Sequence, residues 1–211
     1  MHKRVLGIVT LVILLLLCSS TLAYVAIAGR PVKTQYLLTS GQTYMHILAT
    51  NTSLKKGYIL LPGNTIDASR YDAFAHKLNQ DSTAYVAVLR PSFRFTSAAD
   101  VKGIKRIMLD NPQVYDWVLI GHSAGASIAC KYAGDVRPAL VVTIGGYCKK
   151  PSADIPQIGF FGSNDSFASD KEVSNLYAKT YTLQADHMLP TNTWQNTAQQ
   201  QSLAATIAQY R

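Results

Sequence analysis

The chain has 211 residues, of which 48% are hydrophobic, so a single domain can bury a core of ordinary size without a structural metal or a disulfide scaffold. Its formal net charge is +8, but the lysines and arginines are spread along the chain, and no nucleic-acid-binding motif is present. Composition and charge therefore predict one globular domain and exclude nucleic acid as a partner.

The first 28 residues differ in composition from the rest of the chain. His2-Lys3-Arg4 precedes an almost unbroken apolar run from Val5 to Leu17, a pattern typical of an export signal. Residues 1–28 are either a secretory signal peptide cleaved after Ala26-Ile27-Ala28, or an N-terminal transmembrane anchor, because such a helix can span about 30 Å of hydrocarbon. In both cases the basic residues favour an N-terminus inside, so residues 29–211 are expected outside the cytoplasm, secreted or anchored to the cell membrane.

Beyond this segment, predicted strands and helices alternate. Strands are expected at 35–38, 44–49, 58–61, 84–89, 117–120, 140–144, 158–161 and 179–183, and helices at 69–78, 98–109, 123–133, 170–177 and 193–210. The short turn at residues 39–42 suggests an antiparallel start. The later alternation predicts an α/β domain with a mostly parallel central sheet and helices on both faces. In such a sheet the functional site lies at the carboxyl ends of the strands.

Two cysteines, Cys130 and Cys148, lie beyond the export segment. They are too few for a disulfide scaffold or for a cysteine zinc site. A single bridge between them fits an oxidising compartment, and two buried thiols that pack as small hydrophobic groups fit the sequence equally well. Neither a metal ion nor another cofactor is expected.

The strongest chemical signal is Gly121-His122-Ser123-Ala124-Gly125, which lies between the apolar strand at 117–120 and a helical run that follows. This is the pattern of a nucleophile elbow, in which a tight strand-to-helix turn exposes the serine hydroxyl. Gly121 and Gly125 keep side chains away from the neighbouring backbone. The N–H of Ala124, at the start of the helix, is a candidate oxyanion donor.

A serine nucleophile needs a histidine base and a carboxylate that orients it, in the chain order Ser, acid, His. His187 is the single histidine after Ser123, in the turn that follows the last predicted strand. Asp165 follows a buried strand and its glycine turn, where the acid is expected. Three other aspartates compete for this role: Asp154, Asp170 and Asp186.

A second oxyanion donor is expected from the loop after the third strand. Leu60-Leu61-Pro62-Gly63-Asn64 occupies that place. Gly63 allows close approach of the backbone, and the N–H of Asn64 is the candidate donor. The alternative is a turn in which the proline and glycine serve backbone geometry alone.

The stretch 58–190 resembles the compact bacterial α/β-hydrolase family. The matching motifs are Pro62-Gly63, Asp67 and Tyr71, Leu89-Arg90-Pro91, Trp117 with Gly121-His122-Ser123, Gly162 with Asp165, and His187. The resemblance implies a Ser-Asp-His hydrolase with Ser123, Asp165 and His187 as the triad and Asn64 and Ala124 as oxyanion donors. This chain departs from the family in carrying Gln184-Ala185-Asp186 where relatives commonly have glycines.

About a dozen residues separate the strands at 140–144 and 158–161, which leaves no room for a lid domain. An uncapped site is shallow and suits a small-molecule ester or an acylated polymer at the cell surface. Arg90 and Arg94, with Phe93 and Phe95, follow a strand and are candidates to flank the site, either as contacts for an anionic group or as solvated loop residues.

The sequence therefore predicts an exported serine hydrolase that acts on a carboxylic ester or related acyl bond through an acyl-serine intermediate. Two alternatives stay open. One is a catalytically silent cell-surface binding protein of the same fold. The other is an acyltransferase, in which an alcohol replaces water in the second step.

Overall fold

The computed structural model describes residues 10, 22–23, 25–41, 43–47, 55–99, 101–150, 152–168, 177, 179–191 and 197–210. Most of the predicted signal or anchor segment lies outside these residues, as does the helix expected at 170–177 except for its last residue. Within the part of the chain that is described, no helix is both long and apolar enough to cross a membrane.

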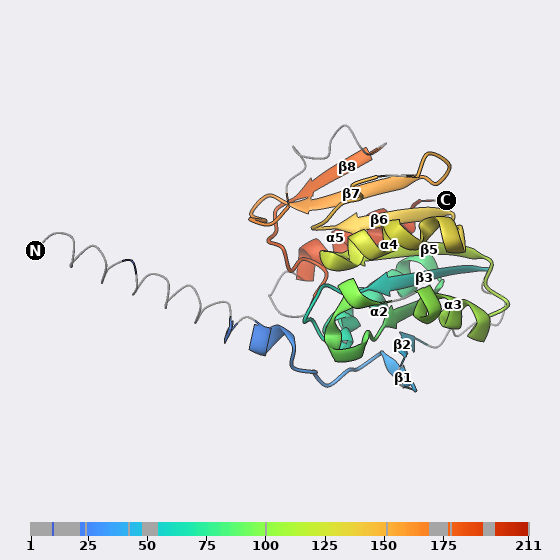
Figure 1. Cartoon of the computed structure of the whole chain (residues 1–211), viewed down its shortest axis with the longest axis horizontal. Coiled ribbons are helices and arrows are strands. Elements are labelled where there is room, and N and C mark those ends of the chain that lie inside the picture. Colours follow the sequence, from blue (N-terminus) through green and yellow to red (C-terminus); the bar gives the residue numbers. More distant parts are fainter. Residues whose placement is uncertain are drawn as a thin grey trace, which may run out of the picture.

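An eight-stranded sheet forms the centre of the domain, in the order β1-β2-β4-β3-β5-β6-β7-β8 (Figure 1). The strands are β1 (Leu38–Ser40), β2 (Tyr44–Ile47), β3 (Lys56–Leu61), β4 (Tyr85–Leu89), β5 (Asp116–His122), β6 (Leu140–Ile144), β7 (Gln157–Gly162) and β8 (Lys179–Leu183). β2 pairs antiparallel with β1 and with β4, and the other neighbours pair in parallel. The prediction of a mostly parallel sheet with an antiparallel start is confirmed.

The first strand begins later than the sequence suggests. A strand was expected at 35–38, but β1 begins at Leu38 because the backbone N–H groups of residues 35–37 donate to the carboxylate of Asp72 at 2.7–3.1 Å. These donors are therefore engaged by a side chain and do not join a strand ladder.

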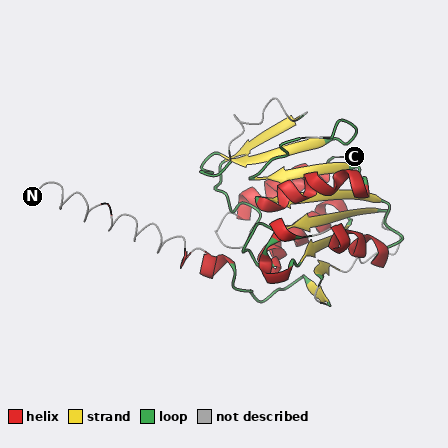
Figure 2. Ribbon diagram, in the orientation of Figure 1, coloured by secondary structure: helices red, strands yellow, loops and turns green. Residues whose placement is uncertain are grey.

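Helices cover both faces of the sheet, as predicted (Figure 2). They are α2 (Asp72–Ser82), α3 (Val101–Asp110), α4 (Ala124–Val136) and α5 (Thr197–Ala208), with short 3₁₀ turns η1 (Ala68–Tyr71), η2 (Ser92–Arg94) and η3 (Thr96–Ala98). α2 and α5 pack on one face, and α3 and α4 on the other. The helix expected to begin at residue 98 begins at Val101, after the turn η3.

β3 shows why the sheet needs helices on both sides. Tyr58 and Leu60 point into the core under α2 and α5, Ile59 and Leu61 point into the core under α3 and α4, and all four are fully buried. Successive side chains of a strand point to opposite faces, so a strand that is apolar throughout is stable only between two layers. The parallel strands then end at one edge, the carboxyl edge, where their loops converge.

The connection from β6 to β7 contains no lid in its described residues, 145–150 and 152–156. It is tied to α4 by a disulfide between Cys130 and Cys148, whose Cα atoms are 5.5 Å apart. The sequence left open whether these cysteines form a bridge or remain two buried thiols, and in the structure they form the bridge.

Candidate active site

Ser123 lies in the turn between β5 and α4 with φ 52° and ψ −118°, a conformation that a non-glycine residue rarely adopts. A Cβ atom on Gly121 would lie 2.4 Å from Cα of Ala126, and one on Gly125 would lie 2.1 Å from the carbonyl oxygen of Leu61. Both positions therefore require glycine, and the turn holds the serine hydroxyl out from the end of the strand.

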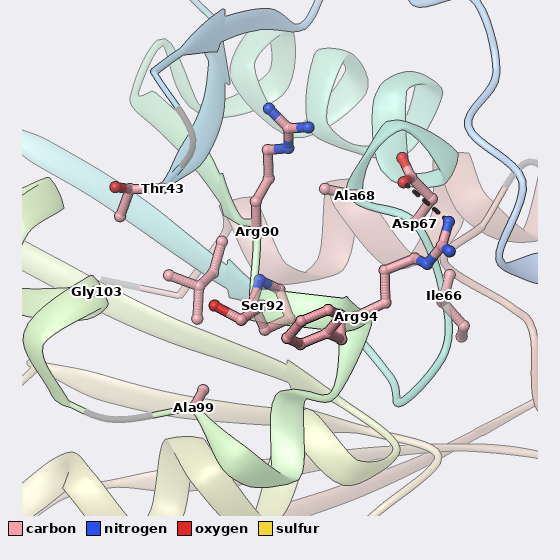
Figure 3. A pocket seen from close by; sticks show the side chains of 12 residues that line it. Thr43, Ile66, Asp67, Ala68, Arg90, Ser92, Arg94, Ala99 and Gly103 are labelled. Atoms are coloured by element: carbon pink, nitrogen blue, oxygen red, sulfur yellow. Dashed lines mark ion pairs between the residues drawn. The ribbon is translucent and has the colours of Figure 1, made fainter.

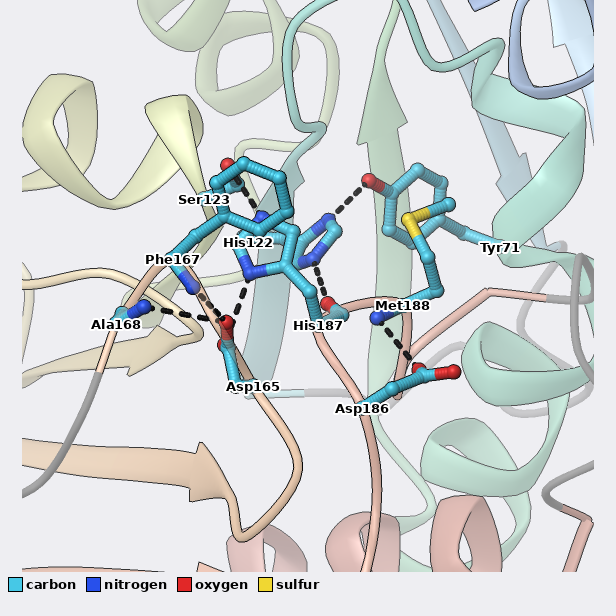
Figure 4. A network of polar contacts seen from close by, with 9 residues as sticks. All are labelled: Tyr71, His122, Ser123, Asp165, Phe167, Ala168, Asp186, His187 and Met188. Carbon is cyan, nitrogen blue, oxygen red and sulfur yellow. Dashed lines mark hydrogen bonds and ion pairs between the residues drawn. The ribbon is translucent and has the colours of Figure 1, made fainter. Parts of the chain in front are cut away.

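The loops after β7 and β8 bring two further side chains to Ser123 (Figure 4). His187 Nε2 is 2.9 Å from Ser123 Oγ, and His187 Nδ1 is 2.8 Å from Asp165 Oδ2. The His187 side chain is 13% exposed and that of Asp165 is 0% exposed, so this hydrogen-bonded series is largely shielded from water. The three residues that the sequence selects from distant parts of the chain meet here.

The second oxygen of Asp165 accepts hydrogen bonds from the backbone N–H groups of Phe167 at 2.7 Å and Ala168 at 3.1 Å. Burial alone would raise the pKa of this carboxyl, but the hydrogen bonds from His187 and from the two N–H groups outweigh burial and lower the pKa below its usual value. The carboxylate is thus held ionised and oriented toward the imidazole.

The competing aspartates are placed otherwise. Asp186 accepts from the backbone N–H of Met188 at 2.9 Å and so shapes its own turn (Figure 4). Asp154 is exposed in the loop that leads into β7, and Asp170 lies outside the described residues. Among the residues that the structure describes, Asp165 is the aspartate bonded to His187.

Gly145, which no sequence motif singles out, packs against the same pair of side chains. Its φ is 56°, and a Cβ atom there would lie 3.0 Å from His187 Nδ1 and 3.1 Å from Asp165 Oδ2. On Gly146 a Cβ atom would lie 2.6 Å from the carbonyl oxygen of Ser123. A Gly-Gly pair directly after a buried strand was the available signal that a backbone passes close to the site.

The turn after β3 approaches Ser123 from the other side. A Cβ atom on Gly63 would lie 3.3 Å from Cβ of Ser123. The Asn64 side chain pairs with Ser97, accepting from its N–H at 2.9 Å and donating to its hydroxyl at 3.0 Å. The N–H of Asn64 has no hydrogen-bond partner among the described residues, whereas the N–H groups of Gly63 and Thr65 are both engaged. The N–H of Ala124 heads α4, where a helix leaves its first donors free.

His122 connects the two sides of the site. It is fully buried, with Nδ1 2.8 Å from the Tyr71 hydroxyl and Nε2 2.7 Å from the carbonyl oxygen of His187. Burial, reinforced by repulsion from His187, lowers the pKa of His122 to about 3, so the ring is neutral. Because a carbonyl only accepts, Nε2–H is the donor and Nδ1 accepts from Tyr71, whose oxygen in turn accepts from the N–H of Gly63 at 2.9 Å.

Two cavities open beside these residues. One has a volume of about 220 Å³ and is lined by Ser123, Ala124, Ser127, Gly145, Gly146, Tyr147, Lys149, Phe167, Ala168 and His187. The other, of about 630 Å³, is lined by Arg90, Phe93 and Arg94 among others (Figure 3). No residue lines both. The arginines expected to flank the site therefore line the neighbouring cavity, where Arg94 lies 3.9 Å from Asp67 in an ion pair.

Strained backbone concentrates around the larger cavity. Thr65, Phe93 and Arg94 have φ values of 64°, 52° and 60°, although none is glycine. The N–H of Thr65 donates to the carbonyl oxygen of Arg94 at 2.7 Å, which joins the strained loops to each other. Among the described residues, no group of three or more His, Cys, Asp or Glu side chains is arranged to hold a metal ion.

Solved structures of low sequence identity share this fold. They include the esterase domain of a Rhodothermus marinus protein, at 16% identity over 78% of this chain and 90% of that one with a TM-score of 0.57. An esterase of the archaeon Pyrobaculum calidifontis covers 90% of this chain and 88% of its own at 14% identity and TM-score 0.59. A serine hydrolase without a lid from Xanthomonas campestris is 12% identical over 75% and 88% of the two chains, with a TM-score of 0.52.

A comparison with curated proteins gave no match. The sequence pattern of the alpha/beta hydrolase family, by contrast, matches residues 57–199, which is more than half of the chain and includes every residue of the site described above. The chain belongs to the alpha/beta hydrolase family.

Proposed function

We propose that the protein is a serine hydrolase that cleaves a carboxylic ester or a related acyl bond. The proposal is carried by one observation, the series of hydrogen bonds from Ser123 Oγ to His187 Nε2 at 2.9 Å and from His187 Nδ1 to Asp165 Oδ2 at 2.8 Å. A nucleophile, a base and a carboxylate in this order are the arrangement that activates a serine hydroxyl.

In the first step, Oγ of Ser123 attacks the carbonyl carbon of the ester while His187 Nε2 takes the hydroxyl proton. The carbonyl oxygen gains the negative charge, and the backbone N–H groups of Asn64 and Ala124 donate hydrogen bonds to it. His187 then gives its proton to the leaving alcohol as the carbon–oxygen bond breaks. Asp165 holds the ring in the required tautomer and stabilises its positive charge.

The acyl-serine is released in the second step. Water enters, His187 takes its proton, and the resulting hydroxide attacks the acyl carbon, so that the acid leaves and Ser123 recovers its proton. The cavity at Ser123 has about 220 Å³, less than the range of ligand cavities that enclose a drug-sized molecule. A short acyl group, or one presented on a surface, fits this site.

We further propose that the domain works outside the cytoplasm. The basic residues before the apolar run at 5–17 favour an N-terminus inside. Independently, the Cys130–Cys148 disulfide is a bond that persists in oxidising compartments and is rare in the cytosol.

The test is labelling of the full chain with a fluorophosphonate, followed by turnover of p-nitrophenyl esters of graded chain length. Ser123→Ala removes the proposed nucleophile, and Ser127→Ala is the matched control because Ser127 lines the same cavity. We expect labelling and turnover to be lost in the first variant and kept in the second. A folded wild-type protein that does not label contradicts the proposal and favours a binding protein, and preferential transfer to an added alcohol favours an acyltransferase.

A further inference from the structure

Exposed phenylalanine side chains lie at the carboxyl edge of the sheet. The large apolar side chains that are exposed among the described residues are Leu22, Val25, Ile27, Leu38, Phe93, Phe95, Leu109, Tyr115 and Phe167, and of these Leu109 and Tyr115 lie near the opposite edge. The three phenylalanines, here termed the aromatic rim, follow the carboxyl ends of β4 and β7, and Phe93 and Phe167 are 90% and 77% exposed. The Phe167 ring is also 4.9 Å from that of His187, so the rim borders the proposed active site.

The apolar N-terminal segment ends on the same edge. Residues 25–28 are helical and, in Figure 1, this helix leaves the domain at the edge toward which the arrows of β3, β6 and β7 point. Ala28 is fully buried in the core, and its carbonyl oxygen accepts from the N–H of Asp67 at 3.1 Å. Asp67 is three residues from Asn64, the proposed oxyanion donor, so the segment ends directly behind that turn.

Two arginine side chains, those of Arg70 and Arg94, bind the backbone at the junction between the apolar segment and the domain. Arg70 donates to the carbonyl oxygens of Ile27 at 2.6 Å and Arg30 at 2.9 Å, and the Arg94 guanidinium donates to that of Gly29. The junction therefore has no free linker: the end of the apolar segment and the carboxyl edge of the sheet are parts of one hydrogen-bonded unit. Wherever the segment is embedded, the edge with Ser123 lies next to it.

The charge of this edge is mainly positive. Arg30, Arg90 and Lys149 are exposed there, besides Arg94, which forms an ion pair with Asp67. The carboxylates nearby are largely engaged, since that of Asp67 pairs with Arg94 and that of Asp165 is bonded within the site. Cations next to exposed aromatic rings complement a surface of anionic headgroups over an apolar layer.

We propose that the carboxyl edge is a membrane-docking surface, which lies on an anionic phospholipid bilayer in which the N-terminal segment is retained as the anchor. The aromatic rim enters the interfacial layer, and Arg30, Arg90 and Lys149 contact the headgroups. The docking is inferred from the exposed aromatic and basic residues of this edge and does not depend on the proposed hydrolase function. The further statement that Ser123 then acts on acyl esters displayed at the bilayer surface rests on the proposed hydrolase function.

The docking is tested by measuring depth in the membrane on the full chain. Cys18 is the one cysteine outside the Cys130–Cys148 disulfide, so it is replaced by serine to leave a single thiol for labelling. The chain with Cys18→Ser is reconstituted into vesicles of phosphatidylglycerol and phosphatidylcholine, and one spin label is attached through Phe93→Cys or Phe95→Cys. Leu109→Cys and Tyr115→Cys are the matched controls, because these exposed residues lie near the opposite edge, at the end of α3 and before β5. Collision of each label with oxygen and with a water-soluble nickel complex reports its depth.

We expect the labels at 93 and 95 to be several-fold less accessible to nickel than those at 109 and 115, and to lie about 5–10 Å below the water boundary. The result should be the same in a Ser123→Ala background. Equal nickel accessibility at all four positions overturns the docking surface. Protection that depends on protein concentration and persists without vesicles also overturns it, in favour of a second copy of the chain. Recovery of a chain that begins at Gly29 overturns retention of the anchor.

Turnover separates this inference from the proposed function. We expect the double variant Phe93→Ser, Phe95→Ser to hydrolyse a short soluble ester as the wild type does, and to hydrolyse an ester embedded in vesicles several-fold more slowly. Leu109→Ser should change neither rate. Equal loss on both substrates overturns the role of the rim in docking. A wild-type chain that is inactive on every ester, yet shows protected labels at 93 and 95, refutes the hydrolase and leaves the docking surface in place.

Discussion

The two sides of Ser123 are built on different principles. On the acid–base side, His187 and Asp165 are bonded to Ser123 and to each other through their side chains. On the oxyanion side, the proposed donors are backbone N–H groups, and side chains such as Tyr71 hold the turn from behind. The chemistry of the acid–base side depends on the identity of its side chains, whereas that of the oxyanion side depends on the position of the backbone. The two sides should therefore respond to different substitutions.

The largest effect is expected on the acid–base side. Asp165→Asn should lower kcat by on the order of 10³–10⁴-fold, because an amide cannot stabilise the imidazolium or fix the tautomer of His187 as the carboxylate does. Ester turnover at saturating substrate measures this loss. Asp186→Asn is the control, since Asp186 bonds only within its own turn among the described residues, at 2.9 Å from the N–H of Met188. Equal losses in the two variants would show that Asp165 is not the orienting acid.

His122, which connects the two sides, should make stability depend on pH. The ring has an ordinary pKa of 6.5 in the unfolded chain and about 3 in the folded protein, so the unfolded chain binds the proton first as the pH falls. The free energy of unfolding should then decrease through the window from pH 6.5 to about 3, with a slope of up to about 1.4 kcal/mol per pH unit.

Urea unfolding at several pH values measures this slope. His122→Gln removes the titrating group and keeps an amide donor toward the carbonyl oxygen of His187, so the slope should become shallower. His46 and His76, whose pKa values are also lowered by burial, should supply part of the slope that is left. An unchanged slope in the variant would mean that His122 is not held neutral in the folded protein.

The oxyanion side is tested by removing a donor without changing a reacting side chain. Asn64→Pro deletes the N–H and should lower kcat by about 10²–10³-fold, the usual effect of losing one oxyanion donor. Asn64→Ala keeps the N–H and loses only the two hydrogen bonds to Ser97, so its effect should be smaller. If the alanine variant loses as much as the proline variant, the side-chain clamp and not the N–H is what the reaction needs.

Gly145 tests how closely the acid–base side is packed. In Gly145→Ala a methyl group would lie 3.0 Å from His187 Nδ1, at a φ of 56° that alanine disfavours. A displacement of the ring by about 1 Å costs about 10²-fold in rate, so kcat should fall by up to that factor. Gly134→Ala is the control, because a Cβ atom there meets nothing within 4 Å; the variant should keep its activity and gain about 0.5–1 kcal/mol of helix stability.

The sequence predicts the acid–base side better than the oxyanion side, and the reason is local. Ser123 sits between a strand and a helix that can both be recognised from their patterns, and Asp165 and His187 follow strands whose carboxyl ends meet at one edge. Each of these positions follows from the neighbouring residues and the rule that parallel strands share an edge. The alternation of strands and helices predicted the layers for the same reason.

What the sequence could not supply depends on contacts between distant segments. The late start of β1 follows from the Asp72 carboxylate, 35 or more residues away. The Tyr71–His122–His187 series spans three elements, and Gly145 matters only because two side chains from other loops pack against it. The pairing of Cys130 with Cys148 likewise needed the packing of α4 against the loop after β6.

The strained loops at Thr65, Phe93 and Arg94 have a practical consequence. A non-glycine residue in the left-handed region costs roughly 1–2 kcal/mol, and three such residues lie together on loops joined by a hydrogen bond. Replacing Thr65 or Phe93 with Gly or Asn should raise the melting temperature by a few degrees, as scanning calorimetry would measure. These loops are therefore the first place to substitute when a heat-resistant variant is engineered, because relieving the backbone strain there should increase the free energy of unfolding.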